Sequence, residues 1–210
     1  MNGRRATRRP ERGRQRFLRV RAILAGGLVL GVGCTLTLAA WNDSEFAAGT
    51  FTASSFQIES SVNSGGAWLA HPTSGSAATM AFNAAGMSPS SVNYAPIWIR
   101  TTAGSLSGTL TLRGASNDNA ALAAALAYRV VRYSSGTCDS SQFTAGASYL
   151  VGTSASKVPL TTSGSATAVA ANSLSPTQMC FEVTMLATAD NSLQGATVTA
   201  TWEIKGTSDS

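Results

Sequence analysis

The side chains that carry most enzyme chemistry are scarce in this sequence. It has one histidine, His71, which precedes Pro72 in a stretch rich in serine and glycine. A Ser-His-Asp triad would rest on His71 alone, and a zinc site of the His-Glu-x-x-His type needs a second histidine. Asp118 and Asp139 lie in turn-like sequence, outside the repeated acidic pattern of a calcium loop. We therefore expect no catalytic, cofactor-binding or metal-binding site, and no enzyme activity.

Cysteine is the other reactive residue, and the chain has three. Cys34 lies inside an apolar run near the N-terminus, which leaves Cys138 and Cys180 for the rest of the chain. In an oxidising compartment these two would form a disulfide, and closing a loop of this length stabilises a fold by about 4 kcal/mol. The alternative is a pair of free thiols.

The N-terminus has the three parts of a secretory signal peptide. Residues 1–21 form a basic region, and residues 22–40 form an apolar region of nineteen uncharged residues. The small residues Ala39 and Ala40 precede Trp41, which predicts cleavage at Ala39/Ala40 or Ala40/Trp41. The alternative is an uncleaved signal anchor, because about twenty apolar residues span a bilayer. We expect a secreted or cell-surface protein that meets the membrane only through an uncleaved leader.

The positive net charge belongs to this leader. Nine of the fifteen basic residues are arginines between Arg4 and Arg21, whereas residues 41–210 carry six basic and nine acidic side chains, a net charge of −3. No basic stripe interleaved with aromatic residues remains after the leader, so we do not expect nucleic acid as a partner.

Residues 41–210 read as one secreted domain of short β-strands. Apolar and polar residues alternate in several segments between turn-like stretches, which is typical of half-buried antiparallel strands with one face on a core and one face in water. The segments are 79–84, 92–102, 106–114, 128–133, 178–186 and 196–205. Pro96 indicates an edge position or a bulge in the second of them. The alternation places Trp98, Met179, Met185 and Trp202 in the core.

One segment, 117–128, predicts a helix instead. It is rich in alanine, and Asn117, Asp118 and Asn119 are each available as its N-cap. We expect a short helix of about two turns between two strands. The predicted fold is all-β: a single antiparallel β-sandwich of the jelly-roll type with one short helix, preceded by the signal helix.

The junction between leader and domain carries a more specific pattern. The stretch "GGLVLGVGCTLTLAAWNDSEFAAGTFTASSFQIES" runs from a glycine-bearing apolar segment into an aromatic residue, an Asn-Asp pair and a Gly-Thr-Phe motif. This pattern resembles the TasA/camelysin-like proteins that are exported with SipW-type signal peptides, and the ending "ATVTATWEIKG" looks like their actinobacterial members. The matching residues are Ala40, Trp41, Asn42, Asp43, Gly49, Thr50, Phe51, Ala53, Phe56 and Ile58.

The resemblance implies a jelly-roll sandwich that a dedicated signal peptidase releases. Some members build surface or biofilm-matrix fibres, in which the freed N-terminal segment adds as a strand to the next copy. By that comparison the donor segment here is Trp41–Ala48, with Trp41, Asn42, Asp43 and Phe46 as its leading residues, and Phe51 and Phe56 as further candidate anchors. A disordered tail is the alternative for 41–48. From Gly49 onward we expect the first strand of the protein's own sandwich.

Two classes of function follow from these observations. The first is a structural protein, a fibre or envelope subunit whose partners are the signal peptidase and other copies of itself. The second is a monomeric secreted binding module or a camelysin-like protease. The single histidine of the sequence offers no ligand cluster for the protease activity.

Overall fold

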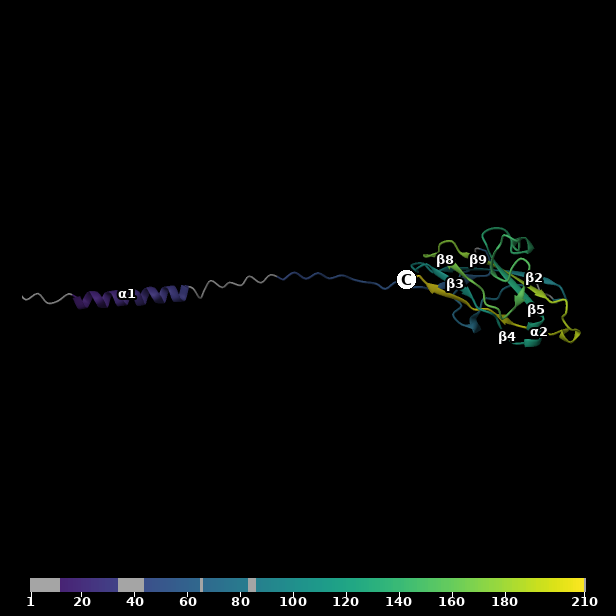
Figure 1. Ribbon diagram of the computed structural model, residues 1–210, viewed down its shortest axis with the longest axis horizontal. Helices are drawn as coiled ribbons and strands as arrows, with labels where there is room; N and C mark the ends of the chain where they lie inside the picture. The colour runs from purple at the N-terminus through teal and green to yellow at the C-terminus, as the bar shows by residue number, and fades with distance from the viewer. Residues whose placement is uncertain (1–11, 34–43, 65, 83–85, 210) are drawn as a thin grey trace, which may run out of the picture. The chain divides into compact units, whose positions relative to one another are not determined.

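The computed structural model describes residues 12–33, 44–64, 66–82 and 86–209 (Figure 1). The chain divides into two compact units, Met1–Phe51 and Thr52–Ser210. The first unit contains helix α1, Arg12–Gly33, whose side chains are exposed from residue 13 to residue 31. In the described part of the chain no helix has the length and apolar character needed to cross a membrane. The predicted cleavage residues Ala39, Ala40 and Trp41 lie outside the described residues.

The second unit, which we call the β-domain, is an antiparallel β-sandwich, as predicted. Its larger sheet has the strand order β1-β2-β9-β5-β6, and β7 also pairs with β5. The bounds of these strands are β1 Ile58–Ser61, β2 Val92–Thr101, β9 Thr177–Met185, β5 Leu126–Tyr133, β6 Ser148–Val151 and β7 Val158–Pro159.

The smaller sheet has only three strands, in the order β11-β3-β8. These are β11 Ile204–Ser208, β3 Gly108–Leu112 and β8 Ala166–Val169. The pair β4 Ser116–Asn117 and β10 Ala200–Thr201 continues the β3–β11 ribbon, since Arg113 N donates to Glu203 O between the two ladders, at 2.8 Å. Three short 3₁₀ turns complete the described elements: Ser74–Ser76, Ser140–Gln142 and Asn191–Leu193.

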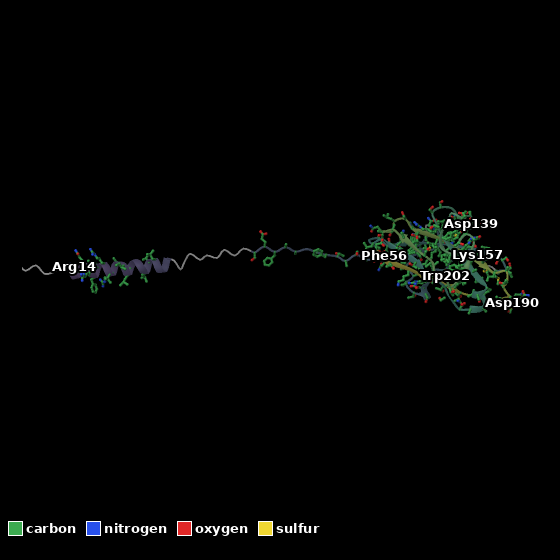
Figure 2. All side chains as sticks on the ribbon, in the orientation of Figure 1. Arg14, Phe56, Asp139, Lys157, Asp190 and Trp202 are labelled. Atoms are coloured by element: carbon green, nitrogen blue, oxygen red, sulfur yellow. A yellow bond between two sulfur atoms is a disulfide. The ribbon has the colours of Figure 1, made fainter. Side chains whose placement is uncertain are left out.

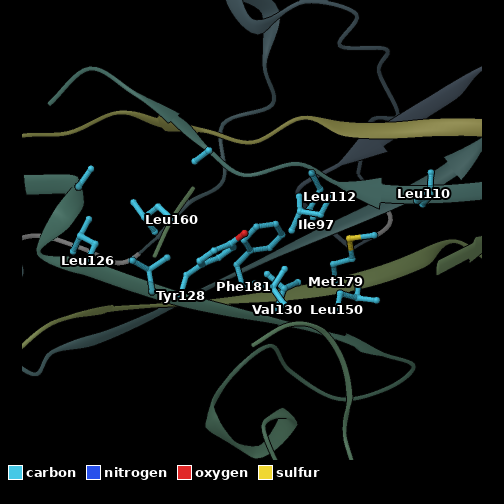
Figure 3. Packing of buried hydrophobic residues seen from close by; sticks show 14 of the residues in the cluster. Ile97, Leu110, Leu112, Leu126, Tyr128, Val130, Leu150, Leu160, Met179 and Phe181 are labelled. Atoms are coloured by element: carbon cyan, nitrogen blue, oxygen red, sulfur yellow. The ribbon is translucent and has the colours of Figure 1, made fainter. Parts of the chain in front are cut away.

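The main core lies between the two sheets (Figure 3). Alternation along β3 buries Gly108, Leu110 and Leu112, as predicted, and the two leucines lie in the same core cluster as Val130 and Phe181 of the larger sheet. Because period-2 patterning is a local property of a strand, it identifies these inward positions without knowledge of the partner strand. The rings of Tyr128, Phe181 and Trp202 pack together at the centre, with centroids 5.3 to 6.5 Å apart.

The outer face of strand β9 is buried, which corrects the prediction that it is in contact with water. Cys180 is 0% exposed and Glu182 is 1% exposed, although both point away from the main core. A second hydrophobic cluster covers this face: Val131, Tyr133, Phe143 and Cys180, with Tyr94, Cys138, Ala147 and Tyr149 packed against it. The loop 134–147 supplies Cys138 and Phe143, and a disulfide joins Cys138 to Cys180 as predicted. The loop therefore acts as a lid that is covalently fixed to the sheet.

The predicted helix is shorter than expected. Helix α2 spans Ala120–Ala124, and the side chain of its N-cap Asn119 accepts a hydrogen bond from Leu122 N. The expected second turn is instead the start of β5, where Leu126 pairs with Met185 of β9. Burial of Leu126 and Tyr128 in the core outweighs the helix propensity of the alanines around them.

Three further predictions along the chain need correction or comment. The predicted strand 79–84 is not a strand over residues 79–82, and its last two residues lie outside the described part. Trp98 is half-buried on the outer face of β2, whereas its neighbours Ile97 and Ile99 enter the core. Pro96 lies opposite Cys180 of β9. On the other side of β2, the pairing with β1 ends at Trp98, so the N–H that proline lacks is not needed for a hydrogen bond to β1.

Candidate functional site

The residues weighed for chemistry at the sequence level have structural roles. His71 Nδ1 hydrogen-bonds the carbonyl of Ser76 within a tight turn. Asp118 accepts a hydrogen bond from Thr199 N, and Asp139 accepts from Ser141 N, so backbone and hydroxyl donors lower the pKa of both carboxylates. Among the described residues, no three His, Cys, Asp or Glu side chains come close enough to hold a metal ion.

A buried ion cluster is the densest group of charges in the β-domain. Glu182 receives two bonds from Arg129, at 3.0 and 2.8 Å, and Lys157 Nζ lies 2.7 Å from its Oε1 atom. Burial raises the pKa of Glu182, but the hydrogen bonds and charges of Arg129 and Lys157 outweigh this effect, and the pKa lies below its usual value. Sequence patterning missed the cluster because it treated Glu182 as solvent-exposed.

This cluster fixes loops in place. Arg129 also donates to the carbonyls of Thr153 and Ser154, and its guanidinium lies 4.7 Å from the centre of the Phe143 ring in the lid. Every acceptor oxygen of Glu182 already has a partner, which leaves no free base or acid at this position. The arrangement holds the 152–157 turn and the disulfide-bonded lid against the sheet, so its role is structural.

The edges of the two sheets provide a stronger candidate site. An unpaired sheet edge presents a row of main-chain N–H and C=O groups that can pair with another strand, and proteins usually cover such edges. Among the described strands the sandwich has four edges, formed by β1, by β6 together with β7, by β8 and by β11. Three of them are covered by residues of the same chain.

The edge of β1 is covered by the segment 66–70. Ser60 N donates to Leu69 O at 2.9 Å, and Leu69 N donates back to Ser60 O at 3.1 Å. The neighbouring Trp68 is held by Arg100, whose guanidinium lies 4.1 Å from the Trp68 ring centre while its Nε donates to Glu59 at 2.7 Å. A cation–π contact and an ion pair thus hold this cover in place.

The edges of β6 and β8 are covered by individual polar groups. On β6, the carbonyl of Leu150 accepts from Ser165 N at 2.8 Å. On β8 and just beyond it, threonine hydroxyls from the larger sheet donate to the free carbonyls: Thr177 to Ala168 at 3.0 Å, and Thr101 to Ala170 at 2.7 Å. A further strand on either edge would have to displace these bonds.

The edge formed by β11 differs from the other three. Residues 203, 205, 207 and 209 direct their main-chain bonds toward β3, as the bonds Arg113 N to Glu203 O and Asp209 N to Ser107 O show. In an antiparallel ladder the alternate residues Ile204, Gly206 and Ser208 then point their N–H and C=O groups to the outside. These outward groups bond to no backbone group within the described residues.

The core is also incompletely covered along this edge. The inward-facing residues of the ribbon are all only half-buried: Val198, Ala200, Trp202, Ile204 and Gly206. At the opposite edge of the same sheet, by contrast, Val169 is 2% exposed. The ring of Phe82 already packs against Trp202, with centroids 6.5 Å apart, and Phe56 lies at Gly206, so a further strand on β11 would extend a cover that the protein's own chain begins.

The N-terminal segment 44–51 has the exposed apolar residues that such a strand would supply. Phe46 and Phe51 are each 96% exposed. The expectation of a strand from Gly49 onward is wrong for residues 49–54, because the first strand of the β-domain begins at Ile58. The proposed leading residues Trp41, Asn42 and Asp43 lie outside the described part.

Phe56, the third candidate anchor, belongs to the protein's own core. Its ring lies against the backbones of Gly108 in β3 and Gly206 in β11, where a Cβ atom would be 2.7 and 2.8 Å from the ring. A side chain at either position would have to displace the ring from its present place. Figure 2 shows Phe56 and Asp190 at opposite ends of the β-domain, so Phe56 closes one end of the sandwich.

Comparison with known proteins adds no assignment. No protein-family model matches the chain, and no curated protein matches it significantly. The resemblance to the TasA/camelysin-like proteins therefore stays a prediction from the residues of the leader junction.

Proposed function

We propose that this protein is a structural subunit of an extracellular or cell-surface assembly, and that copies join when the N-terminal segment of one adds as a strand to the open β11 edge of the next. Strand addition is a recurrent mode of recognition, in which main-chain hydrogen bonds supply affinity and alternate side chains supply specificity. The leader would keep the segment from pairing until it is removed after export.

The observation that carries the proposal is the difference between the four sheet edges. Three edges are covered by hydrogen bonds from the same chain, whereas β11 presents three residues with outward main-chain groups beside a half-buried apolar strip. Phe46 supports the same proposal, since it is a 96% exposed apolar side chain whose burial in a contact with another copy would be favourable.

The first experiment compares the secreted protein with a form that lacks Trp41–Ala48. N-terminal sequencing of the secreted protein first establishes whether it begins at Ala40 or Trp41. Light scattering and electron microscopy at increasing concentration then follow assembly. We expect the full form to assemble and the shortened form to stay monomeric, with thermal unfolding of the two monomers at nearly the same temperature.

A matched pair of variants separates a specific role of the segment from general surface hydrophobicity. Phe46→Ser removes an exposed apolar side chain from the segment, and Leu174→Ser removes one, 63% exposed, from the loop after β8. We expect the first to prevent assembly and the second to leave it intact. A full-length secreted protein that stays monomeric at high concentration would refute the proposal and favour a soluble binding module. Unfolding of the shortened form would instead identify residues 41–48 as an internal strand.

A further inference from the structure

We propose a specific register for this contact, which rests on the proposed function: residues 44–48 of a second copy pair antiparallel to β11, with Glu45 opposite Lys205 and Phe46 opposite Ile204. The partner is another copy of the same chain.

The charges supply the first step. In the β-domain, Arg100, Arg129 and Lys157 form ion pairs with glutamates of the same domain. Lys205 is exposed on β11 and forms no ion pair among the described residues, and Glu45 is the only charged residue of 44–51. Strand β11 itself carries one charge, Lys205, with Glu203 just before it and Asp209 just after it, and the segment 44–51 carries the opposite charge of Glu45.

The position of Lys205 favours a cross-strand pair. Its main-chain groups bond to β3, so toward an added strand it occupies a position without direct hydrogen bonds. Opposite residues at such positions have the closest side chains in an antiparallel pair. A glutamate placed there lies within reach of the ammonium group on the outer, wet face of the small sheet.

Fixing Glu45 opposite Lys205 determines the other pairs. In the antiparallel direction Phe46 lies opposite Ile204 and Ala48 lies opposite Trp202. All four side chains are then on the inner face of the smaller sheet. An aromatic residue beside a β-branched one is a favourable cross-strand pair, and alanine leaves space beside the large indole. The main-chain groups of Ile204 and Gly206, which point outward, then bond to Phe46 and Ser44.

The parallel direction is less compatible with the same edge. With Glu45 again beside Lys205, it places Phe46 beside Gly206. The space at Gly206 is already filled by the ring of Phe56 from the same copy, 2.8 Å from where a Cβ atom would lie. A second aromatic ring there would compete with Phe56, whereas the antiparallel register leaves Phe56 in place.

Charge reversal tests the Glu45–Lys205 pair. We measure the lowest concentration that supports assembly for the full secreted chain carrying Lys205→Glu, Glu45→Lys, or both. Each single variant places two like charges opposite each other, and their repulsion should raise this concentration about threefold to tenfold. The double variant restores the pair and should return close to the original value.

The control for this series is Arg132→Glu, which makes the same change in net charge at an exposed position on β5. It should leave the assembly concentration unchanged. Equal effects of Arg132→Glu and Lys205→Glu, or a double variant no better than the singles, would overturn the ion pair.

Cysteine crosslinking tests the direction of the added strand. A chain carrying Ala47→Cys is mixed with a chain carrying Glu203→Cys, which the antiparallel register places opposite each other, or with one carrying Thr207→Cys, which the parallel register would require. We expect a disulfide-linked pair of chains only in the first mixture. Crosslinking in the second mixture would reverse the direction, and crosslinking in neither would overturn the proposed register.

These outcomes are separable from those of the proposed function. If removal of Trp41–Ala48 abolishes assembly but neither mixture crosslinks, the function stands and the register is wrong. If the shortened chain still assembles, the segment is not the donor and both proposals fail.

Discussion

Replacement of Glu182 by glutamine should destabilise the β-domain strongly. The side chain is 1% exposed and neutralises Arg129 and Lys157, whose side chains are 13% and 29% exposed. Removing one partner of a buried ion pair costs about 3 to 5 kcal/mol, because the remaining charge is left without compensation. Both cations retain some access to water here, so we expect a loss of about 3 kcal/mol of unfolding free energy, which lowers Tm by about 6 to 12 °C in a domain of this size.

The pH dependence supplies a second, independent measurement. Because the folded protein holds the pKa of Glu182 below its usual value, the ion cluster stabilises the domain fully above the unfolded carboxyl pKa of about 4.3. That contribution is lost as the pH falls through the lower folded value. Urea unfolding between pH 7 and pH 2 should therefore show an acid-side loss of stability that is smaller in Glu182→Gln than in the native sequence.

Glu59→Gln provides the matched control. Glu59 pairs with Arg100 at 2.7 Å, but the two side chains are 17% and 26% exposed at the surface of the larger sheet. Because Glu59 is more exposed than Glu182 and has one cationic partner instead of two, we expect Glu59→Gln to cost less, on the order of 1 kcal/mol. If Glu182→Gln costs no more than Glu59→Gln, the cluster does not carry the stability that its burial and geometry imply.

Three further predictions concern the core and the lid. Cys138→Ser should lower the unfolding free energy by about 4 kcal/mol, because the disulfide closes a loop with a sequence separation of 42. The mass of the native protein should rise by two hydrogens on reduction. Gly108→Ala should destabilise more than Gly206→Ala in chemical denaturation, since a Cβ at 108 meets the backbone oxygen of Thr207 at 2.2 Å whereas one at 206 meets only side chains, those of Phe56 and Ile58, which can move. Equal losses would contradict this reasoning. Burial raises the pKa of Tyr128 to about 12, so in an ultraviolet titration this residue should ionise at a higher pH than an ordinary tyrosine. The unfolding free energy should fall as the pH rises above about 10, because the unfolded tyrosine ionises first. A Tyr128→Phe variant with an unchanged titration curve would refute the assignment.

The sequence predicted those parts of the fold that depend on local patterning. Alternation in 106–114 and 178–186 identifies the inward residues of β3 and β9, because side-chain direction repeats every two residues whatever the partner strand is. The pairing of Cys138 with Cys180 follows from their number and the expected compartment. The class of fold and much of its core were therefore available without coordinates.

The rest depends on contacts between distant residues. Glu182 looks solvent-exposed in the alternation of β9 because nothing nearby shows that the loop 134–147 covers that face. One signal was present: Cys180 shares the outward face, and a disulfide there requires the segment around Cys138 to lie over it. No such signal showed that β11 is open. The difference between the edges depends on covering bonds from distant residues such as Leu69 and Thr101, which the other three edges receive and β11 does not.

The covered edges also limit the shape of any assembly that forms by strand addition. Among the described residues each copy then has one donor segment and one open acceptor strand, a valence of two, because the bonds from Leu69, Ser165, Thr101 and Thr177 cover β1, β6 and β8. Such head-to-tail contacts close into rings when the rotation between neighbours permits and otherwise extend as filaments. A branch point would need a second acceptor, so chains joined in this way are unbranched and any lateral bundling uses the faces of the sandwich.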